Sequence, residues 1–400
     1  MYEINSIQES NPVRIIEPKL KAKVQPGSNV IIRSCDNIFD LKKFAQFPYD
    51  LYHTNPYWVP PRIGDELKAL QPVTNPAFKI CEAKFWLAIK DCKVAGRIGA
   101  IINKQYNDKT GEQMCRISRL EFIDDKNVSK ALLDTAEKWA KEKGMDGTHG
   151  PLGFTNLDHQ AILIEGFDHL PSIASEYHLP YYRRHLEEAG YGKEMDWVEF
   201  RLKLEKEIPE KALKLNDMIQ RRYHLKVVHF NNRMEMKAYA PKILALLNVA
   251  FGELFSFVAM DEELSEFYIN KYFSILNPKF VKVIEDKDAS IIGFIISLPS
   301  LSHAMQKSKG KLFPFGWYHL SKALKRPKVV DLLLTGIHPD WQAQGVSAIL
   351  ITELQKVMQE HGVEYVETTG MLETNEKAIN HWKNYNHIQH KRKRCFRKMF

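Results

Sequence analysis

The stretch Val330–Leu350 reads VDLLLTGIHPDWQAQGVSAIL and carries the most informative pattern of the 400 residues. An apolar strand runs into a short loop, and an amphipathic helix opens at Gly345 and continues to about Gly362. Because glycine has no Cβ, the backbone can approach a ligand closely at this junction. The first N–H groups of a helix lack internal partners and lie at the positive end of its dipole. The pattern therefore predicts an anion site suited to a diphosphate.

The segments around this stretch repeat an order of elements that occurs earlier in the chain. In each half, a strand, a pair of helices, three strands, a helix, a strand, a helix and a final strand follow one another. The predicted second-half elements are 225–230, 238–251, 261–273, 280–286, 290–298, 329–339, 346–362, 363–370, 373–386 and 388–398, with an insertion at 302–328. This order predicts an internal duplication with little residue identity.

The loop ahead of the helix resembles the cofactor motif of the GNAT superfamily of acyl-CoA-dependent N-acyltransferases. That motif is Gln or Arg, two residues, Gly, one residue, then Gly or Ala. Here it reads Gln342-Ala343-Gln344-Gly345-Val346-Ser347, with Ser in the last small position. The preceding Ile337-His338-Pro339-Asp340 is similar to the family's strand exit.

The resemblance implies acetyl-CoA or another acyl-CoA as co-substrate, bound in the splay between strands 332–337 and 364–369, and no metal. The residues expected to bind the cofactor lie on the strand exit, the loop and the downstream helix: Gly336, Ile337, Gln342, Ala343, Gln344, Gly345, Val346, Ser347 and Asn375.

The catalytic groups are less well indicated. In the family a Tyr seven residues after the Asn protonates the departing thiolate, but here Asn375 is followed by Trp382. Tyr385 is the candidate substitute. An amine of pKa about 10.4 is protonated at neutral pH, so a base must take its proton. Glu373 is the candidate base, with helix capping as the competing interpretation.

The first half departs from the motif at the corresponding loop. Alignment of the two helices places Asp125 where Gln342 stands, and Asp124 adds a second carboxylate. Like charge disfavours a diphosphate there. We expect the first half to keep the fold, to lack the cofactor and to shape the acceptor site, with the segment 150–177 as a candidate wall.

The predicted fold class is α/β (α+β), with two GNAT-like domains that each hold a mixed, mostly antiparallel sheet flanked by helices. The predicted divisions are a polar N-terminal arm (1–29), a degenerate GNAT-like domain (30–205), a bridging helix (206–225) and a GNAT domain with the acyl-CoA site (226–400). A length of 400 residues favours two domains.

Composition narrows the class of protein. Five dispersed cysteines without a CxxC pair argue against disulfides and structural zinc. No apolar run approaches the roughly 18 residues of a membrane span, and the N-terminus lacks the apolar core of a secretory signal. We therefore expect a cytoplasmic protein. Six Lys or Arg within 391–398 are interpreted as a solvated terminal strand in preference to a nucleic-acid site.

The predicted function is transfer of an acetyl or other acyl group from acyl-CoA to an amine of a small-molecule acceptor. A long-chain transferase of the N-acyl amino acid synthase type is an alternative, in which the insertion 302–328 covers a lipid chain. A non-catalytic acyl-CoA-binding protein is a second alternative. The sequence leaves a homodimer open.

Overall fold

The computed structural model describes residues 30–382 and 385–400, and the predicted arm 1–29 lies outside this range. The first half contains β1 (Ile31–Ser34), α1 (Ile38–Leu51), α2 (Ile63–Ala69), β2 (Cys81–Lys90), β3 (Lys93–Asn103), α3 (Lys104–Thr110), β4 (Met114–Phe122), α4 (Lys126–Glu142), β5 (Gly147–Gly150), β6 (Ile162–Glu165), α5 (Tyr181–Glu188) and β7 (Gly192–Lys203). The second contains α6 (Glu210–Tyr223), β8 (Lys226–Val228), α7 (Arg233–Ala250), α8 (Glu262–Tyr272), β9 (Val281–Glu285), β10 (Ile291–Pro299), α9 (Ser302–Ser308), α10 (Gly316–Lys325), β11 (Val329–Ile337), α11 (Val346–Glu360), β12 (Tyr365–Thr368), β13 (Met371–Leu372), α12 (Glu376–His381) and β14 (His387–Met399).

The predicted duplication is visible in the order of these elements. β1, α1, α2, β2, β3, β4, α4, β5, α5 and β7 correspond in turn to β8, α7, α8, β9, β10, β11, α11, β12, α12 and β14. Each half is mixed, with mostly antiparallel strands and one parallel pair, β4–β5 in the first and β11–β12 in the second. The insertion α9–α10 stands between β10 and β11, where the first half carries only the short α3.

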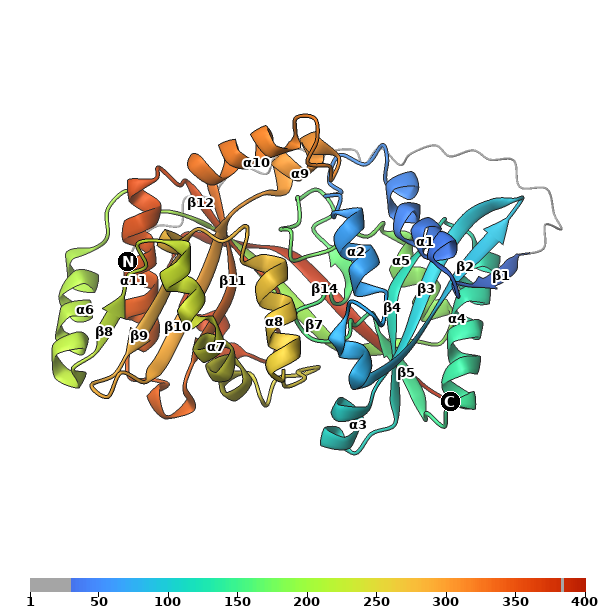
Figure 1. Ribbon diagram of the computed structural model, residues 1–400, viewed down its shortest axis with the longest axis horizontal. Helices are drawn as coiled ribbons and strands as arrows, with labels where there is room; N and C mark the ends of the chain where they lie inside the picture. The colour runs from blue at the N-terminus through green and yellow to red at the C-terminus, as the bar shows by residue number, and fades with distance from the viewer. Residues whose placement is uncertain (1–29, 383–384) are drawn as a thin grey trace, which may run out of the picture.

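The two halves share one continuous sheet, which the sequence did not predict. The strand order is β1-β2-β3-β4-β5-β14-β7-β12-β11-β10-β9-β8, and Figure 1 shows β7 and β14 crossing the middle of the molecule. The last strand of each half thus pairs with the other half, since β14 lies against β5 and β7 lies against β12. The two last strands also pair with each other, which joins the halves through backbone hydrogen bonds.

The interpretation of 391–398 as a solvated strand was wrong, because β14 is central. Lys391 and Lys393 are 2% and 6% exposed. The six basic side chains of the segment all pair with carboxylates, most of them on strands far away in sequence: Glu112, Glu137, Glu165, Glu194, Asp196, Glu199, Glu367 and Glu373. The basic side chains of 391–398 therefore form ion pairs within the fold.

Each half places an amphipathic helix on one face of its part of the sheet. α4 packs on β2–β5 through Leu132, Ala136 and Trp139, and α11 packs on the second half through Ile349 and Leu354. Figure 1 shows these helices at opposite ends of the molecule, with α9 and α10 along one edge. Within the part of the chain described, no helix is long and apolar enough to cross a bilayer.

Candidate active site

The strands β11 and β12 separate after a short parallel contact. They pair from Val329 with Tyr365 to Leu332 with Thr368, and β11 then continues to Ile337 beside β10 alone. A side-chain contact marks the base of the fork, where Thr369 Oγ1 donates to the carbonyl of Leu333 at 3.0 Å. β11 also contains a bulge at this level, because Leu333 has no partner in β10. The pair thus opens towards the loop that precedes α11.

The N-terminus of α11 carries backbone donors without a cap. Gly345 occupies the N-cap position, and no side chain accepts a hydrogen bond from the first turn. The N–H groups of Val346 and Ser347 make no hydrogen bond to any group in residues 30–382 and 385–400. Since uncapped first-turn amides are the usual anion site of a helix, this terminus has the chemistry that a diphosphate needs.

Gly345 is required for a reason that the sequence did not reveal. Its φ is +82°, and a Cβ there would lie 2.4 Å from Cδ1 of Ile219 in α6. The side free of Cβ is therefore filled by α6, and not by open space for a ligand. Gly336 is similar, because a Cβ there would lie 2.5 Å from Cε1 of Phe294 in β10.

The rest of the predicted cofactor loop lies at the surface. Gln342 and Ala343 are exposed, and Ala343 has a φ of +62°. Gln344 donates from Nε2 to the carbonyl of Asp340 at 2.7 Å, which closes the loop on itself. His338 accepts from the N–H of Asp340 through its ring, so it serves as a loop residue.

The corresponding terminus of α4 in the first half is occupied by its own side chains. Asp125 accepts hydrogen bonds from the N–H groups of Asn127 and Val128, at 2.9 and 3.3 Å, and also pairs with Lys90. Asp124 pairs with Arg184 and His185 across to α5. The two helix termini differ in the property that matters for an anion, since one is capped by a carboxylate and the other is bare.

The three predicted residues downstream of β12, Glu373, Asn375 and Tyr385, have different partners. Asn375 caps α12 by accepting from the N–H of Ala378 at 3.2 Å. Glu373 pairs with Lys193 at 2.5 Å and with Arg392 at 3.2 Å. The capping interpretation applies to Asn375 and not to Glu373, whose carboxylate is engaged by two cations.

The predicted helix 373–386 is shorter in the structure, because α12 ends at His381. Tyr385 lies outside α12, but its N–H donates to the carbonyl of Trp382 at 3.0 Å and the two rings pack with centroids 6.0 Å apart. The run NHWKNYN contains several residues of low helix propensity, which accounts for the early end.

Tyr385 and Trp382 line a narrow apolar groove at the foot of the fork. Its other walls come from α11, β7 and the paired part of the fork, and its lining residues include Leu202, Leu332, Leu354, Met358 and Val366. Burial raises the pKa of the Tyr385 hydroxyl, which therefore stays protonated at neutral pH. The groove offers an apolar surface with one phenol beside the fork.

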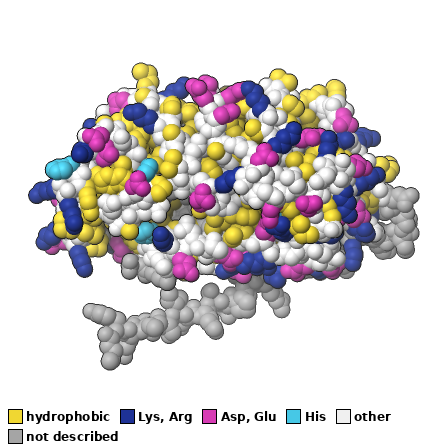
Figure 2. Space-filling view, turned by 90° about the horizontal axis from the view of Figure 1, so that it is seen from below, with side chains coloured by type: hydrophobic (Ala, Val, Ile, Leu, Met, Phe, Trp, Pro, Cys, Tyr) yellow, Lys and Arg dark blue, Asp and Glu magenta, His cyan; other side chains and the backbone are white. Residues whose placement is uncertain are grey.

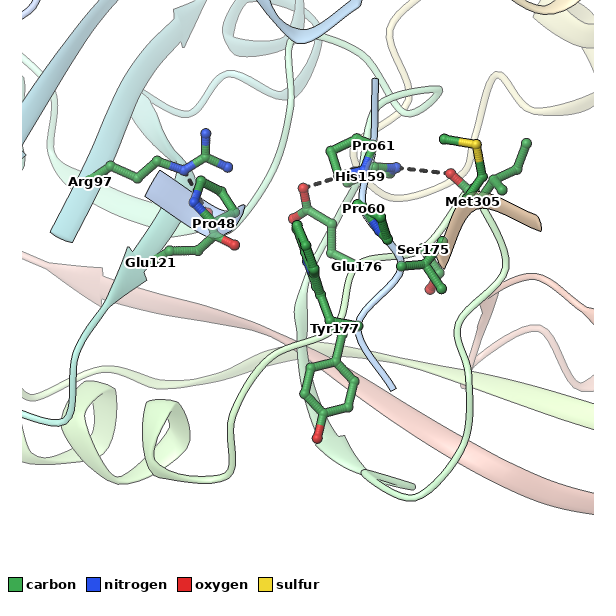
Figure 3. A pocket seen from close by; sticks show the side chains of 13 residues that line it. Pro48, Pro60, Pro61, Arg97, Glu121, His159, Ser175, Glu176, Tyr177 and Met305 are labelled. Carbon is green, nitrogen blue, oxygen red and sulfur yellow. Dashed lines mark hydrogen bonds and ion pairs between the residues drawn. The ribbon is translucent and has the colours of Figure 1, made fainter. Parts of the chain in front are cut away.

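A second pocket lies on the opposite face of the sheet, between the two halves. Figure 3 shows His159 and Glu176 at its centre, Arg97 and Glu121 at one end and Met305 of α9 at the other. The predicted wall 150–177 supplies five of its lining residues: His159, Ile173, Ser175, Glu176 and Tyr177. Met305 and Ile173 pack in the same cluster as Leu333 of β11, so this end of the pocket adjoins the fork.

His159 is held between two acceptors. Its Nδ1 lies 2.8 Å from Glu176 Oε1, and its Nε2 lies 3.2 Å from the carbonyl of Ile173. Since both neighbours only accept, the arrangement favours the doubly protonated ring, in which both nitrogens donate. Burial alone would lower the pKa of His159, but the adjacent Glu176 carboxylate outweighs it and holds that pKa above its usual value. The same contact holds the pKa of Glu176 well below its usual range despite burial.

A chain of buried charged groups runs from this pocket along the central strands. Ser175 donates to Glu199 at 2.8 Å, and Glu199 pairs with Lys393 at 3.0 Å and Lys391 at 3.3 Å. Lys391 continues to Glu367 of β12 at 3.6 Å. Burial opposes the charge on Glu199, but the two lysines lower its pKa to about 2. The chain links the pocket to the strand that forms one side of the fork.

Asp331 of β11 lies beside this chain and has an unsatisfied carboxyl group. It is fully buried in register with Glu367, and neither carboxylate oxygen has a hydrogen-bond partner among the described residues. Burial, with the nearby Glu367 charge, raises the pKa of Asp331 to about 8. Asp331 is therefore mainly protonated at neutral pH.

Sequence reasoning proposed the segment 150–177 as a candidate wall but singled out none of its polar residues. The strongest indication available was charge inside apolar strands, such as Arg97 in VAGRIGAII and Asp331 in VVDLLL. Buried charged groups without local partners mark functional or interior networks. His159 and Glu176 have no such pattern, because they lie in irregular chain. No group of three or more metal-ligating side chains occurs in the residues that the structure covers.

In each half, a parallel pair of strands, β4–β5 or β11–β12, precedes or flanks a helix, α4 or α11, and of these two helices only α11 lacks a side-chain cap. The chain has the tandem GNAT fold. A tandem GNAT protein from the clavulanic acid biosynthesis pathway superposes with a TM-score of 0.53 at 12% identity, over 93% of this chain and 98% of that one.

Two curated proteins are similar in sequence along nearly the whole chain. Protein YghO of Escherichia coli (strain K12) is 27% identical over 376 residues, which are 92% of this chain and 95% of that protein. The bacterial ceramide synthase of Caulobacter vibrioides (strain NA1000 / CB15N) is 27% identical over 352 residues, 86% of this chain and 90% of that protein. No protein-family model matches the chain.

Proposed function

We propose that the protein is an N-acyltransferase that moves an acyl group from an acyl-CoA thioester to the amine of a small-molecule acceptor. The observation that carries the proposal is the bare N-terminus of α11 at the open end of the β11–β12 fork. The capped terminus of α4 supplies an internal comparison, because the Asp125 carboxylate there occupies the amides of Asn127 and Val128 and adds negative charge where an anion would bind. One acyl-CoA per chain follows from this difference.

In this proposal the N–H groups of Val346 and Ser347 bind the diphosphate, with the other predicted loop residues around it. The thioester arm then runs along the fork. Beyond Leu332 the peptide groups on the β12 side of β11 have lost that strand as a partner. Their N–H groups are available to polarise the thioester carbonyl as negative charge develops on its oxygen.

The acceptor amine enters from the pocket that holds His159. As the free base, His159 takes a proton from the ammonium, and the neutral amine then attacks the thioester carbon. The C–N bond forms, the C–S bond breaks, the nitrogen releases its second proton to water, and the thiolate leaves with a proton. Tyr385 remains our candidate to supply that proton, since its protonated hydroxyl lines the groove beside Leu332.

Two carboxylates, Glu121 and Glu373, are the other candidates for the general base, and their positions and partners favour His159. Glu121 also lines the pocket, and burial raises its pKa to about 7. However, β4 is separated from β12 by four strand spacings, or roughly 19 Å at about 4.8 Å each. Glu373 stays a sequence-based candidate, but its pairs with Lys193 and Arg392 leave it less able to accept a proton.

We infer further that the acyl group is long and the acceptor is an amino alcohol with a long chain. Ceramide is an amide of this kind, and the Caulobacter relative carries that activity in its name. The apolar groove of Trp382, Leu202, Leu354 and Met358 beside the fork offers a surface for methylenes. Transfer of an acetyl group, the other prediction from sequence, needs no such groove.

The test is a series of acetyl-, octanoyl- and palmitoyl-CoA with sphinganine or ethanolamine as acceptor, measured by release of free CoA and by mass of the amide. We expect the fastest turnover with palmitoyl-CoA and sphinganine, and a loss of about 10²–10⁴-fold in His159→Gln. Strict preference for acetyl-CoA would remove the long-chain inference. No turnover with any pair would remove the enzymatic one and leave an acyl-CoA-binding protein.

A further inference from the structure

The insertion between β10 and β11 exposes a row of aromatic side chains. Phe313, Phe315, Trp317 and Tyr318 are 79%, 70%, 56% and 52% exposed. They lie on the loop between α9 and α10 and on the first turn of α10, along the edge of the molecule in Figure 1. The sequence suggested that these rings cover a lipid chain inside the site, but they point outward.

The same insertion concentrates the positive charge of the protein. Residues 301–330 contain seven Lys or Arg and no Asp or Glu. The whole chain has 57 basic and 49 acidic residues, so the remainder holds 50 against 49 and is almost neutral. The net charge of +8 is therefore mainly a property of this one segment.

Most of these cations are uncompensated. Lys328 pairs with Glu364, whereas no carboxylate of the described chain pairs with the other six: Lys307, Lys309, Lys311, Lys322, Lys325 and Arg326. The face turned away from α10 is different, because Figure 2 shows Lys or Arg interspersed with Asp or Glu over that face. We call the four aromatic and six basic residues of the insertion the α9–α10 surface.

We propose that the α9–α10 surface docks on the surface of an anionic phospholipid bilayer. Tryptophan and tyrosine favour the level of the headgroups, and lysines beside them attract anionic lipid. A second copy of the chain is disfavoured as the occupant, because two surfaces of this charge repel. Protein interfaces are depleted in lysine, which disfavours a protein partner as well.

The α9–α10 surface lies close to the pocket that holds His159. α9 also supplies Met305 to the wall of the pocket that holds His159. Gln306 ties α9 to the carbonyls of Pro56 and Trp58, at 2.7 and 3.0 Å, beside the same pocket. A bilayer bound here would lie next to the acceptor pocket, although docking itself requires no catalysis.

The experiment is co-sedimentation of the full chain with vesicles of phosphatidylcholine, with and without phosphatidylserine. We expect binding to the vesicles that contain phosphatidylserine and weakening by salt. Lys322→Glu/Lys325→Glu and Phe315→Ser/Trp317→Ser should each weaken binding by about tenfold or more. The matched controls are Lys287→Glu in the β9–β10 turn and Phe39→Ser in α1, which is 72% exposed, and these should bind as the wild type does.

Three outcomes would overturn the proposal. They are absence of binding to anionic vesicles, equal weakening by the control variants, and a dimer in sedimentation velocity that Phe315→Ser/Trp317→Ser disrupts. Because no outcome depends on turnover, docking and acyl transfer fail or survive separately. Retained fold of each variant is checked by its thermal transition.

Discussion

The glycine at the start of α11 is constrained by its backbone and by its neighbour. Gly345 has a positive φ and faces Ile219, whereas Gly362 at the other end of the helix has a φ of +67° and nothing within 4 Å of its missing Cβ. The motif that predicts a ligand site in sequence is thus partly a packing requirement of α6. Sequence alone offered no way to separate the two, since the contact joins residues 126 positions apart.

The two glycines therefore predict different costs for the same change. Gly362→Ala should lower the free energy of unfolding by about 1 kcal/mol, from the backbone conformation alone. Gly345→Ala should lower it by about 2–4 kcal/mol, because the added Cβ must also displace Ile219. Urea denaturation of both variants measures the difference, and equal costs would contradict the packing role.

The His159–Glu176 pair predicts a pH dependence. Glu176 holds the pKa of His159 above its usual value, so the active free base forms only as the pH rises beyond that raised value. The profile of kcat/KM should therefore rise with pH on a limb above about 6.5. In Glu176→Gln the carboxylate is absent, and the limb should move to lower pH.

A limb unmoved by Glu176→Gln would contradict this role of His159. The matched variant is Glu194→Gln, which removes the carboxylate beside His149 at 3.2 Å, outside the pocket. It should leave the limb in place. The His159–Glu176 pair also affects stability. Because the pKa of His159 is raised in the fold, the pair stabilises the protein at low pH, and this contribution is lost as the pH rises through the folded pKa.

At the scale of elements, the sequence predicted most strands and helices and misjudged the environment of some. Periodicity is local, so the duplicated order and the long α4 and α11 could be read from spacing. The end of α12 at His381 depended on weak propensities. The place of β14 depended on partners such as Glu199 and Glu367, which no local pattern reveals.

Asp331 makes the stability of β11 depend on pH. Its pKa is raised to about 8 in the fold, above the unfolded value of about 3.9. Its favourable contribution is therefore complete below the unfolded pKa and is lost as the pH rises through about 8. Asp331→Asn removes this loss. The free energy of unfolding of the variant should therefore exceed that of the wild type by at least about 1.4 kcal/mol at high pH, and by less under mild acid.

Chemical denaturation at mildly acidic and mildly alkaline pH measures the two gaps. Both proteins lose stability in strong acid as Glu199 and Glu176 are protonated, so the comparison must be between variant and wild type at each pH. A gap that stays constant with pH would show that Asp331 is not the titrating group.

At the scale of the whole molecule, the halves depend on each other through the exchange of last strands. β14 completes β5 of the first half, and β7 completes β12 of the second. The predicted domain division at 205 and 226 follows the order of the chain, whereas the hydrogen bonds of these two strands cross it. The sequence gives the order of the strands along the chain, but it does not indicate whether β7 and β14 pair with their own half or with the other half.

Removal of residues 387–400 should therefore unfold the first half as well as the second. β5 would keep β4 but lose β14, and Glu137, Glu194 and Glu199 would lose the cations of β14 that pair with them. Circular dichroism and denaturation of the shortened chain test this expectation. Removal of Phe400 alone is the control and should leave a cooperative transition, whereas an intact first half after removal of β14 would contradict the dependence.

Isothermal titration calorimetry of two matched variants measures whether acyl-CoA binds at α11 and not at α4. Ser347→Glu and Asn127→Glu each add a carboxylate at the second position of the respective helix. A first-turn carboxylate favours the helix dipole, so both chains should remain folded. We expect one site per chain in the wild type, with an affinity unchanged by Asn127→Glu and weakened about tenfold or more by Ser347→Glu. Equal binding by all three proteins, or loss in Asn127→Glu alone, would contradict this expectation.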